Sequence, residues 1–273
     1  MADQSASGRI GRRTAFTGLA AAVPIAAGLA RPASGAGAGK RTFVLVHGAW
    51  HGAWCYQRVT DKLTSAGHKV YTPTLTGLAD RSHLMMPGIT LQTHVDDVVN
   101  LIKWEDLTDI VLCGHSYGGA VISGVAEAML PQIASIVFLD AFMPESGQTI
   151  AELSPTSREN VLASQARGAI SLPAPPARAF AVNPADQAMV DAKCTPQPIR
   201  TFTEGIPITG ARERVRRKAY VRGEQYARDA FDAAYEKARQ DPGWVAHKLP
   251  CGHDVMLDLP DRIAEILLQA AAN

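Results

Sequence analysis

The residues best suited to do chemistry lie in one glycine-rich segment, Gly114-His115-Ser116-Tyr117-Gly118-Gly119. A serine in this G-x-S-x-G spacing, between an apolar stretch (109–113) and a helical pattern of small residues (120–129), is typical of a nucleophile on a sharp strand-to-helix turn. Glycines let the chain turn without Cβ clashes, and the start of a helix favours developing negative charge. We therefore expect Ser116 to act as a nucleophile.

A serine hydroxyl needs a base to accept its proton, and histidine is the usual one. His253 is the only one of the eight histidines that follows the last predicted strand (244–248) and precedes the last predicted helix (260–271). His47 and His115 belong to glycine turns, where a structural role is expected. A packed or solvated imidazole is expected for the other five, which are His51, His68, His83, His94 and His247. The sequence therefore predicts that His253 is the base.

Negative charge that develops on a carbonyl oxygen needs two hydrogen-bond donors. One is expected to be the backbone N–H of Tyr117, because that residue follows the nucleophile. The other is expected from the turn after the first predicted strand, His47-Gly48-Ala49-Trp50. We expect the N–H of Ala49 to be this second donor.

Short β-rich runs alternate with longer helical patterns along most of the chain, and this alternation must position these residues. Strands are predicted at 42–46, 69–72, 109–113, 133–139, 218–221 and 244–248, and helices at 54–65, 91–104, 120–129, 229–239 and 260–271. Such alternation indicates an α/β fold, with a mostly parallel sheet of about six strands covered by helices on both faces.

The alternation stops between residues 145 and 211, which contain eight prolines. We interpret this segment as a mostly helical lid inserted after the fourth strand. The core is then expected to comprise residues 39–144 and 212–273. Fold alone does not determine a substrate, and we expect the lid to select it.

The first 38 residues differ from the rest. Arg12-Arg13 precede a weakly apolar stretch rich in Ala and Gly, and Ala36-Gly37-Ala38 has the small-x-small pattern of a cleavage site. These features together indicate a twin-arginine export signal. We therefore expect a periplasmic or secreted protein, with a disordered Ala-rich tail as the alternative.

Composition excludes several classes of partner. The 273 residues include 27 Lys and Arg against 26 Asp and Glu, and without a long basic stripe no nucleic-acid binding is expected. No run of 18 strongly apolar residues exists, so no stable membrane insertion is expected. Four scattered cysteines do not make a disulfide scaffold. The histidines and acids show no metal-ligand spacing, and neither a metal nor another cofactor is expected.

Several motifs together resemble the α/β-hydrolase superfamily: HGAWHGAW after the first strand, GHSYGG around Ser116 and GHD around His253. Within it, FVLVHGAWHGAW followed by LTSAGHKVYTPTLTG is similar to the serine esterase branch that contains plant methyl-ester esterases and hydroxynitrile lyases, with bacterial esterase relatives. The resemblance extends over nearly all of the chain from residue 42 onward and is weakest in the lid. It implies a catalytic triad in the order Ser, Asp or Glu, His.

The triad acid departs from the usual pattern of this branch. The loop after the fifth predicted strand reads Arg222-Gly223-Glu224-Gln225-Tyr226 and contains no aspartate. Some haloalkane dehalogenases, which the chain resembles in this respect, carry their acid at the end of the previous strand, where this chain has Asp140. A histidine partner would stabilise an aspartate that ends a buried strand. We expect Asp140 to be the acid, with Glu224 as the alternative.

Apolar side chains near these turns are expected to form the wall of a substrate pocket. The predicted wall consists of Trp50, Trp54, Met85, Phe142 and Met143, accompanied by Leu84, Met86 and Phe202. Such a wall favours a hydrophobic acyl group or an aromatic substrate.

These features predict a serine hydrolase that cleaves small hydrophobic or aromatic carboxylic esters through an acyl-enzyme intermediate. Amide, lactone or haloperoxidase-like chemistry on the same triad remains an alternative. A hydroxynitrile lyase is a further one, although the lyases resembled carry threonine and lysine where this chain has Gly48 and Asp254. The last alternative is a non-catalytic receptor that binds a ligand.

Overall fold

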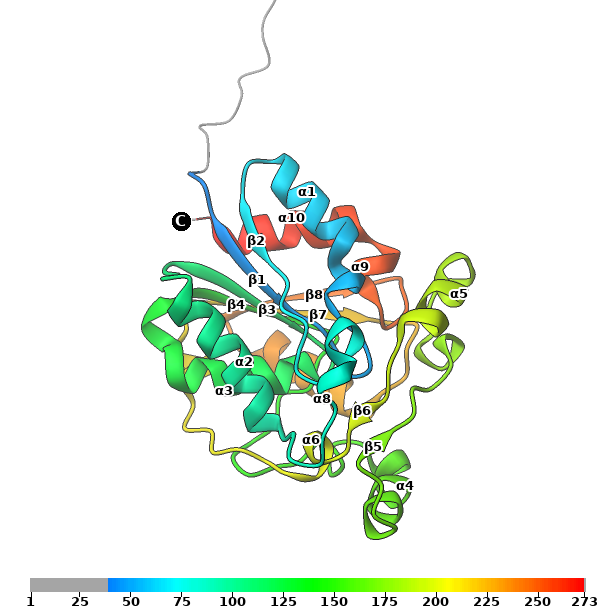
Figure 1. Cartoon of the computed structure of the whole chain (residues 1–273). Coiled ribbons are helices and arrows are strands. Elements are labelled where there is room, and N and C mark those ends of the chain that lie inside the picture. Colours follow the sequence, from blue (N-terminus) through cyan, green and yellow to red (C-terminus); the bar gives the residue numbers. More distant parts are fainter. Residues whose placement is uncertain (1–38, 273) are drawn as a thin grey trace, which may run out of the picture. The chain divides into compact units, whose positions relative to one another are not determined.

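Six parallel strands form the sheet that positions the site. The computed structural model describes residues 39–272, so the predicted export signal lies outside the described residues. The strand order is β2-β1-β3-β4-β7-β8, and each strand pairs in parallel with its neighbours (Figure 1). The bounds are Thr42–Val46 for β1, Lys69–Tyr71 for β2, Ile110–His115 for β3, Ile133–Leu139 for β4, Arg217–Gly223 for β7 and Trp244–Leu249 for β8.

Both faces of the sheet are apolar, because successive side chains of a strand point to opposite faces. In β3, Leu112 packs into one hydrophobic cluster while Val111 and Cys113 pack into the other. One face is covered by α2 (Leu91–Trp104), α3 (Gly118–Met129) and α8 (Asp229–Gln240). The opposite face is covered by α1 (Gln57–Ser65), α9 (Val255–Asp258) and α10 (Pro260–Ala271), as Figure 1 shows.

The site lies where the strand order reverses. The chain passes from β1 outward to β2 and then returns to β3 on the other side of β1. The loops that follow β1 and β3 therefore leave neighbouring strands at the same edge of the sheet, the usual place for a ligand in an open parallel sheet. These two loops contain Ala49 and Ser116, and the loops after β4 and β8 bring Asp140 and His253 to the same edge.

The lid (residues 145–211) shares both hydrophobic cores. Val161 and Phe202 pack into one cluster, and Phe180 and Val190 into the other. Its helices are α4 (Pro155–Ala166), α5 (Pro184–Lys193), α6 (Arg200–Thr203) and, at its end, α7 (Ala211–Arg214). A two-stranded antiparallel sheet of β5 (Ser171–Leu172) and β6 (Gln197–Pro198) crosses it. The lid is thus helical, as expected, with a small sheet that was not expected.

Fold class and sheet are confirmed, and most element bounds differ from the expected ones by at most a few residues. The short helix α9 and four 3₁₀ turns were not expected; the turns are η1 (Ala53–Tyr56), η2 (Ala79–Leu84), η3 (Leu130–Gln132) and η4 (Ala177–Phe180). None of the described helices is both long and apolar enough to cross a bilayer. The four cysteines are free thiols.

Candidate active site

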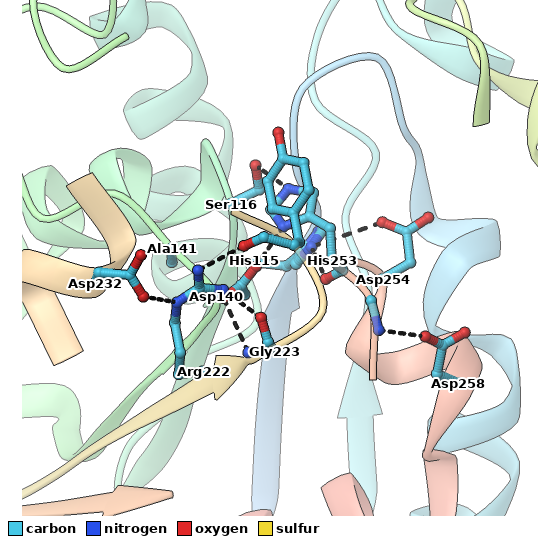
Figure 2. Close-up of polar contacts among 12 residues, drawn as sticks. His115, Ser116, Asp140, Ala141, Arg222, Gly223, Asp232, His253, Asp254 and Asp258 are labelled. Carbon is cyan, nitrogen blue, oxygen red and sulfur yellow. Dashed lines mark hydrogen bonds and ion pairs between the residues drawn. The ribbon is translucent and has the colours of Figure 1, made fainter. Parts of the chain in front are cut away.

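Three buried side chains from distant parts of the chain meet at the carboxyl edge of the sheet (Figure 2). The Oγ of Ser116 lies 2.9 Å from Nε2 of His253, and Nδ1 of His253 lies 2.6 Å from Oδ2 of Asp140. Because a carboxylate only accepts hydrogen bonds, Nδ1 carries the proton and Nε2 is left to accept from the serine hydroxyl. This is the arrangement of a nucleophile, a base and an acid that orients the base.

The turn at Ser116 depends on backbone strain and close packing. Ser116 itself adopts a left-handed conformation with φ 53°, so the nucleophile rather than a glycine takes the strained position. The glycines serve a different purpose, because a Cβ on Gly114 would lie 2.5 Å from the carbonyl oxygen of Gly118, and one on Gly119 would lie 2.3 Å from that of Phe142. The turn at Ser116 therefore leaves no room for a side chain at Gly114 or Gly119.

Asp140 is fully buried and is charge-compensated on its second oxygen. Its Oδ1 accepts from Nη1 of Arg222 at 2.7 Å and from the backbone N–H of Gly223 at 3.0 Å. Arg222 is also buried and donates from Nε to Asp232 at 2.9 Å. A buried carboxylate is tolerable only when paired and hydrogen-bonded, and these donors together with His253 meet that condition.

Glu224 is exposed, and the proton on Nδ1 of His253 is directed at Asp140 instead. The loop that would carry the usual acid thus supplies a backbone N–H, from Gly223, to an acid on the neighbouring strand. Sequence reasoning missed Arg222. A basic residue directly at the carboxyl end of a predicted strand was the available signal.

The two backbone amides expected to hold an oxyanion come from the loop after β1 and from the residue that follows Ser116. Among the described residues, neither the N–H of Ala49 nor that of Tyr117 has an acceptor within hydrogen-bonding range. The peptide that carries the Ala49 N–H is fixed by His47, whose Nδ1 donates to the carbonyl of Gly48 at 2.8 Å while Nε2 accepts from the N–H of Leu75. Burial lowers the pKa of His47 to about 3, so the ring stays neutral.

Tyr117 is anchored by a second buried histidine. Nε2 of His94 donates to the carbonyl of Thr76 at 2.9 Å, and Nδ1 accepts from the hydroxyl of Tyr117 at 2.9 Å. Burial lowers the pKa of His94 to about 4, which keeps this pattern of one donor and one acceptor. His47 therefore fixes the Gly48–Ala49 peptide, and His94 anchors the side chain of Tyr117.

A cavity of about 420 Å³ opens beside Ser116 and His253. Its lining is mainly apolar and combines the loop after β1, the end of β4 and the lid: Trp50, Phe142, Ile150, Val161, Leu172, Phe180 and Phe202. Trp50, Phe142 and Phe202 thus line the cavity as expected. Sequence reasoning missed the other lid residues, because the Pro-rich segment shows no clear periodicity.

Five expected pocket residues lie outside this lining. Trp54 stacks on His51, with ring centroids 5.1 Å apart, and packs into the core on the α1 side of the sheet. Met143 packs against the opposite core. Met85 lies at the end of η2, beside the exposed Leu84 and Met86. The expectation for these residues was wrong because proximity in sequence to a turn does not determine which way a side chain points.

A buried ion pair connects the loop after β1 with the loop that carries the base. Nε2 of His51 lies 3.1 Å from Oδ2 of Asp254, and Nδ1 of His51 donates to the carbonyl of Ala49 at 2.8 Å. His115 donates from Nε2 to the carbonyl of His253 at 2.9 Å. His253 and Asp254 are adjacent in the sequence, and nothing there indicated that His253 would pair with Asp140 and Asp254 with His51.

Opposite pKa shifts support this pair. Burial by itself lowers the pKa of His51, but the Asp254 carboxylate raises it well above 6.5. Burial by itself raises the pKa of Asp254, but the charge of His51 holds it well below its usual range. Burial lowers the pKa of His115 well below 6.5, and so does the proximity of His253. His51 is therefore the charged imidazole of this group.

Residues 43–266 match the model of the Alpha/beta hydrolase family. The chain belongs to this family. A carbendazim hydrolyzing esterase from Nocardioides sp. (strain SG-4G) is 40% identical over 235 residues, which cover 82% of this hydrolase and 97% of that protein. Methylesterase 7 of Arabidopsis thaliana is 37% identical over 111 residues, which cover 39% of this hydrolase and 42% of that protein. The hydrolase is an esterase, in line with these relatives.

Solved structures agree with the fold. An extracellular alpha/beta-hydrolase from a Paenibacillus species superposes with a TM-score of 0.69 at 25% identity, over 84% of this hydrolase and 98% of that chain. Tomato methylketone synthase I superposes with a TM-score of 0.70 at 20% identity, over 85% of this hydrolase and 98% of that chain. This second likeness concerns the fold alone.

Removing both charges of the His51–Asp254 pair should change how the stability of the hydrolase depends on pH. A group whose pKa is raised on folding stabilises the folded state below its unfolded pKa and loses this effect as pH rises through the folded pKa. The difference in free energy of unfolding between wild type and His51→Gln/Asp254→Asn should therefore stay constant between roughly pH 4 and 6.5 and decrease above pH 6.5.

Urea unfolding at a series of pH values measures this difference. The decrease should reach a slope of at most about 1.4 kcal/mol per pH unit, the limit for one proton. Below roughly pH 4 the contribution of Asp254 should disappear, because the unfolded carboxylate then becomes protonated. A difference that stays flat from pH 6.5 to 9 would show that His51 is not held as a cation.

Proposed function

We propose that this esterase is a serine carboxylesterase with Ser116 as nucleophile, His253 as base and Asp140 as the orienting acid. The observation that carries the proposal is the continuous hydrogen-bonded path from Oγ of Ser116 through His253 to Asp140, at 2.9 and 2.6 Å, beside an apolar cavity. The substrates proposed are esters with a small hydrophobic or aromatic group.

Acylation follows from this geometry. Oγ of Ser116 attacks the ester carbonyl carbon while its proton moves to Nε2 of His253. The negative charge moves to the carbonyl oxygen, where the N–H groups of Ala49 and Tyr117 stabilise it. The imidazolium returns its proton to the leaving alcohol, and the acyl group stays on Ser116.

Deacylation uses the same groups with water in place of the alcohol. His253 takes a proton from water, the resulting hydroxide attacks the acyl carbon, and the proton then returns to Ser116. Asp140 remains ionised throughout and stabilises the imidazolium in both steps. The buried guanidinium of Arg222 binds the other oxygen of this carboxylate, so it does not compete for the oxygen that faces His253.

Ester cleavage is favoured over the lyase reaction by the neighbourhood of the base. Asp254 occupies the position where the hydroxynitrile lyases resembled carry a lysine, and its carboxylate is buried against His51. This position thus supplies no ammonium group to the cavity. The names of the relatives suggest the first substrates to try, which are methyl esters and carbendazim.

Replacement of the nucleophile tests the proposal. Ser116→Ala should lower kcat for p-nitrophenyl acetate by at least about 10²–10⁴-fold, because general-base activation has no hydroxyl left to act on. His68→Gln is the matched control, because His68 directly precedes β2, at the opposite edge of the sheet from the site and outside the cavity lining, and this variant should retain wild-type turnover. Cleavage by Ser116→Ala within tenfold of the wild-type rate would contradict the mechanism.

We also propose that residues 1–38 direct export by the twin-arginine route. The paired Arg12-Arg13, the mild apolar stretch and the small residues before position 39 support this assignment. In a bacterial host with this pathway, the full chain should appear in the periplasm, shortened by about the length of this segment. The Arg12→Lys/Arg13→Lys variant should stay unprocessed in the cytoplasm. Export of that variant at the wild-type level would contradict the assignment.

A further inference from the structure

One cationic side chain lines the otherwise mainly apolar cavity. Arg228 lies just before α8 and shares the cavity lining with Ser116 and His253. Aromatic rings surround its guanidinium. The Cζ atom is 5.9 Å from the ring centroid of Phe142, 5.8 Å from that of Tyr226 and 5.9 Å from that of Phe231.

Arg228 has no acidic partner among the described residues. No carboxylate of this part of the chain lies within 4.0 Å of its guanidinium, and its Nε is buried without a hydrogen-bond acceptor. Arg212 and Arg222 differ, because each of these buried arginines pairs with a carboxylate. Burial raises the pKa of the neighbouring Tyr226 phenol, although Arg228 lowers it, so this phenol stays neutral and adds no negative charge beside the guanidinium.

The contacts leave donors available. Aromatic rings attract a cation through their faces. Of the three rings only Tyr226 carries an acceptor, and its phenol oxygen accepts a hydrogen bond from Arg228, while the Nε of Arg228 remains without an acceptor. A guanidinium carries five N–H donors in a rigid planar fork that matches a carboxylate. A partly buried cation without a counterion is unfavourable, and a ligand acceptor in the cavity would remove that penalty.

The guanidinium lies close to the reacting centre. The Phe231 ring stacks on the imidazole of His253, with centroids 5.3 Å apart and an interplanar angle of 14°, and the Tyr226 ring centroid lies 4.5 Å from the same imidazole. These two rings also contact Arg228, so a single aromatic side chain separates the base from the cation. An ester carbonyl held at Ser116 would thus leave the distal end of an aromatic substrate within reach of Arg228.

We propose that Arg228 is a specificity-determining residue that binds a hydrogen-bond acceptor on the substrate, most strongly a carboxylate, at the end remote from the scissile ester. The substrate class is then an aromatic ester with an acceptor in the para position. This inference rests on the proposed function, because it takes Ser116 as the point where the carbonyl is held. It refines the purely hydrophobic pocket that sequence alone predicts.

Three methyl benzoates test the inference, with a para carboxylate, a para acetyl group and a para methyl group. The first supplies an anionic acceptor, the second a neutral one and the third none. In the wild type, kcat/KM for the ester with the para carboxylate should exceed that for the ester with the para methyl group by about tenfold or more. A hydrogen bond to a charged group contributes free energy of this size. The value of kcat/KM for the ester with the para acetyl group should lie between these two.

Arg228→Gln should reduce the ratio of kcat/KM between the para-carboxylate and para-methyl compounds to about one, mainly through a higher KM for the para-carboxylate compound. Arg228→Lys keeps the charge but loses the planar fork, so it should retain part of the carboxylate preference. Arg178→Gln is the matched control, because Arg178 is an exposed lid arginine outside the cavity lining, and it should keep the wild-type ratio. A ratio unchanged in Arg228→Gln would overturn the inference.

Dissociation constants provide a readout that needs no turnover. The same three esters are titrated into Ser116→Ala and into Ser116→Ala/Arg228→Gln, and the carboxylate preference should be present only in the first protein. Equal preferences in the two would also overturn the inference. Because this measurement does not depend on catalysis, failure of the nucleophile assignment and failure of the Arg228 assignment give different results.

Discussion

The hydrogen bond between Asp140 and His253 is the interaction on which the rest of the site depends. It joins residues 113 positions apart at 2.6 Å in a place closed to solvent. An isolated carboxylate there would be protonated or expelled, so the bond requires the cation of Arg222 on the other oxygen. Once Asp140 is ionised and fixed, the imidazole has one tautomer and one orientation, with Nε2 directed at Ser116.

The sheet supplies this bond as a consequence of its topology. Strands β3, β4 and β7 are adjacent, and Ser116, Asp140 and Gly223 come at or just beyond their carboxyl ends. Ser116 and Asp140 both adopt left-handed backbone conformations, with φ 53° and 45°. Such strain persists only where the surrounding structure holds the backbone in place. Here the closely packed glycines of the turn at Ser116 do so. Two neutral buried histidines add to this order, because His47 fixes the Gly48–Ala49 peptide and His94 anchors the side chain of Tyr117.

The elements and the meeting of Ser116 with His253 were predictable, because both depend on local pattern. The strand-glycine-serine-glycine-helix order indicated Ser116, and the place of His253 between the last strand and last helix indicated the base. The acid was expected at Asp140 by resemblance, with Glu224 left open, because sequence does not show which strand ends are neighbours. Arg222 and Arg228 were missed, because their importance arises from contacts made only after the chain has folded.

The rate at which a fluorophosphonate labels Ser116 tests the account most directly, because this reaction needs the activated hydroxyl but no particular substrate. Asp140→Asn should slow labelling by about 10²–10⁴-fold at neutral pH, since the imidazole loses the partner that fixes its tautomer. Glu224→Gln should be labelled at the wild-type rate. Labelling of Asp140→Asn at the wild-type rate, or a loss confined to Glu224→Gln, would contradict the account.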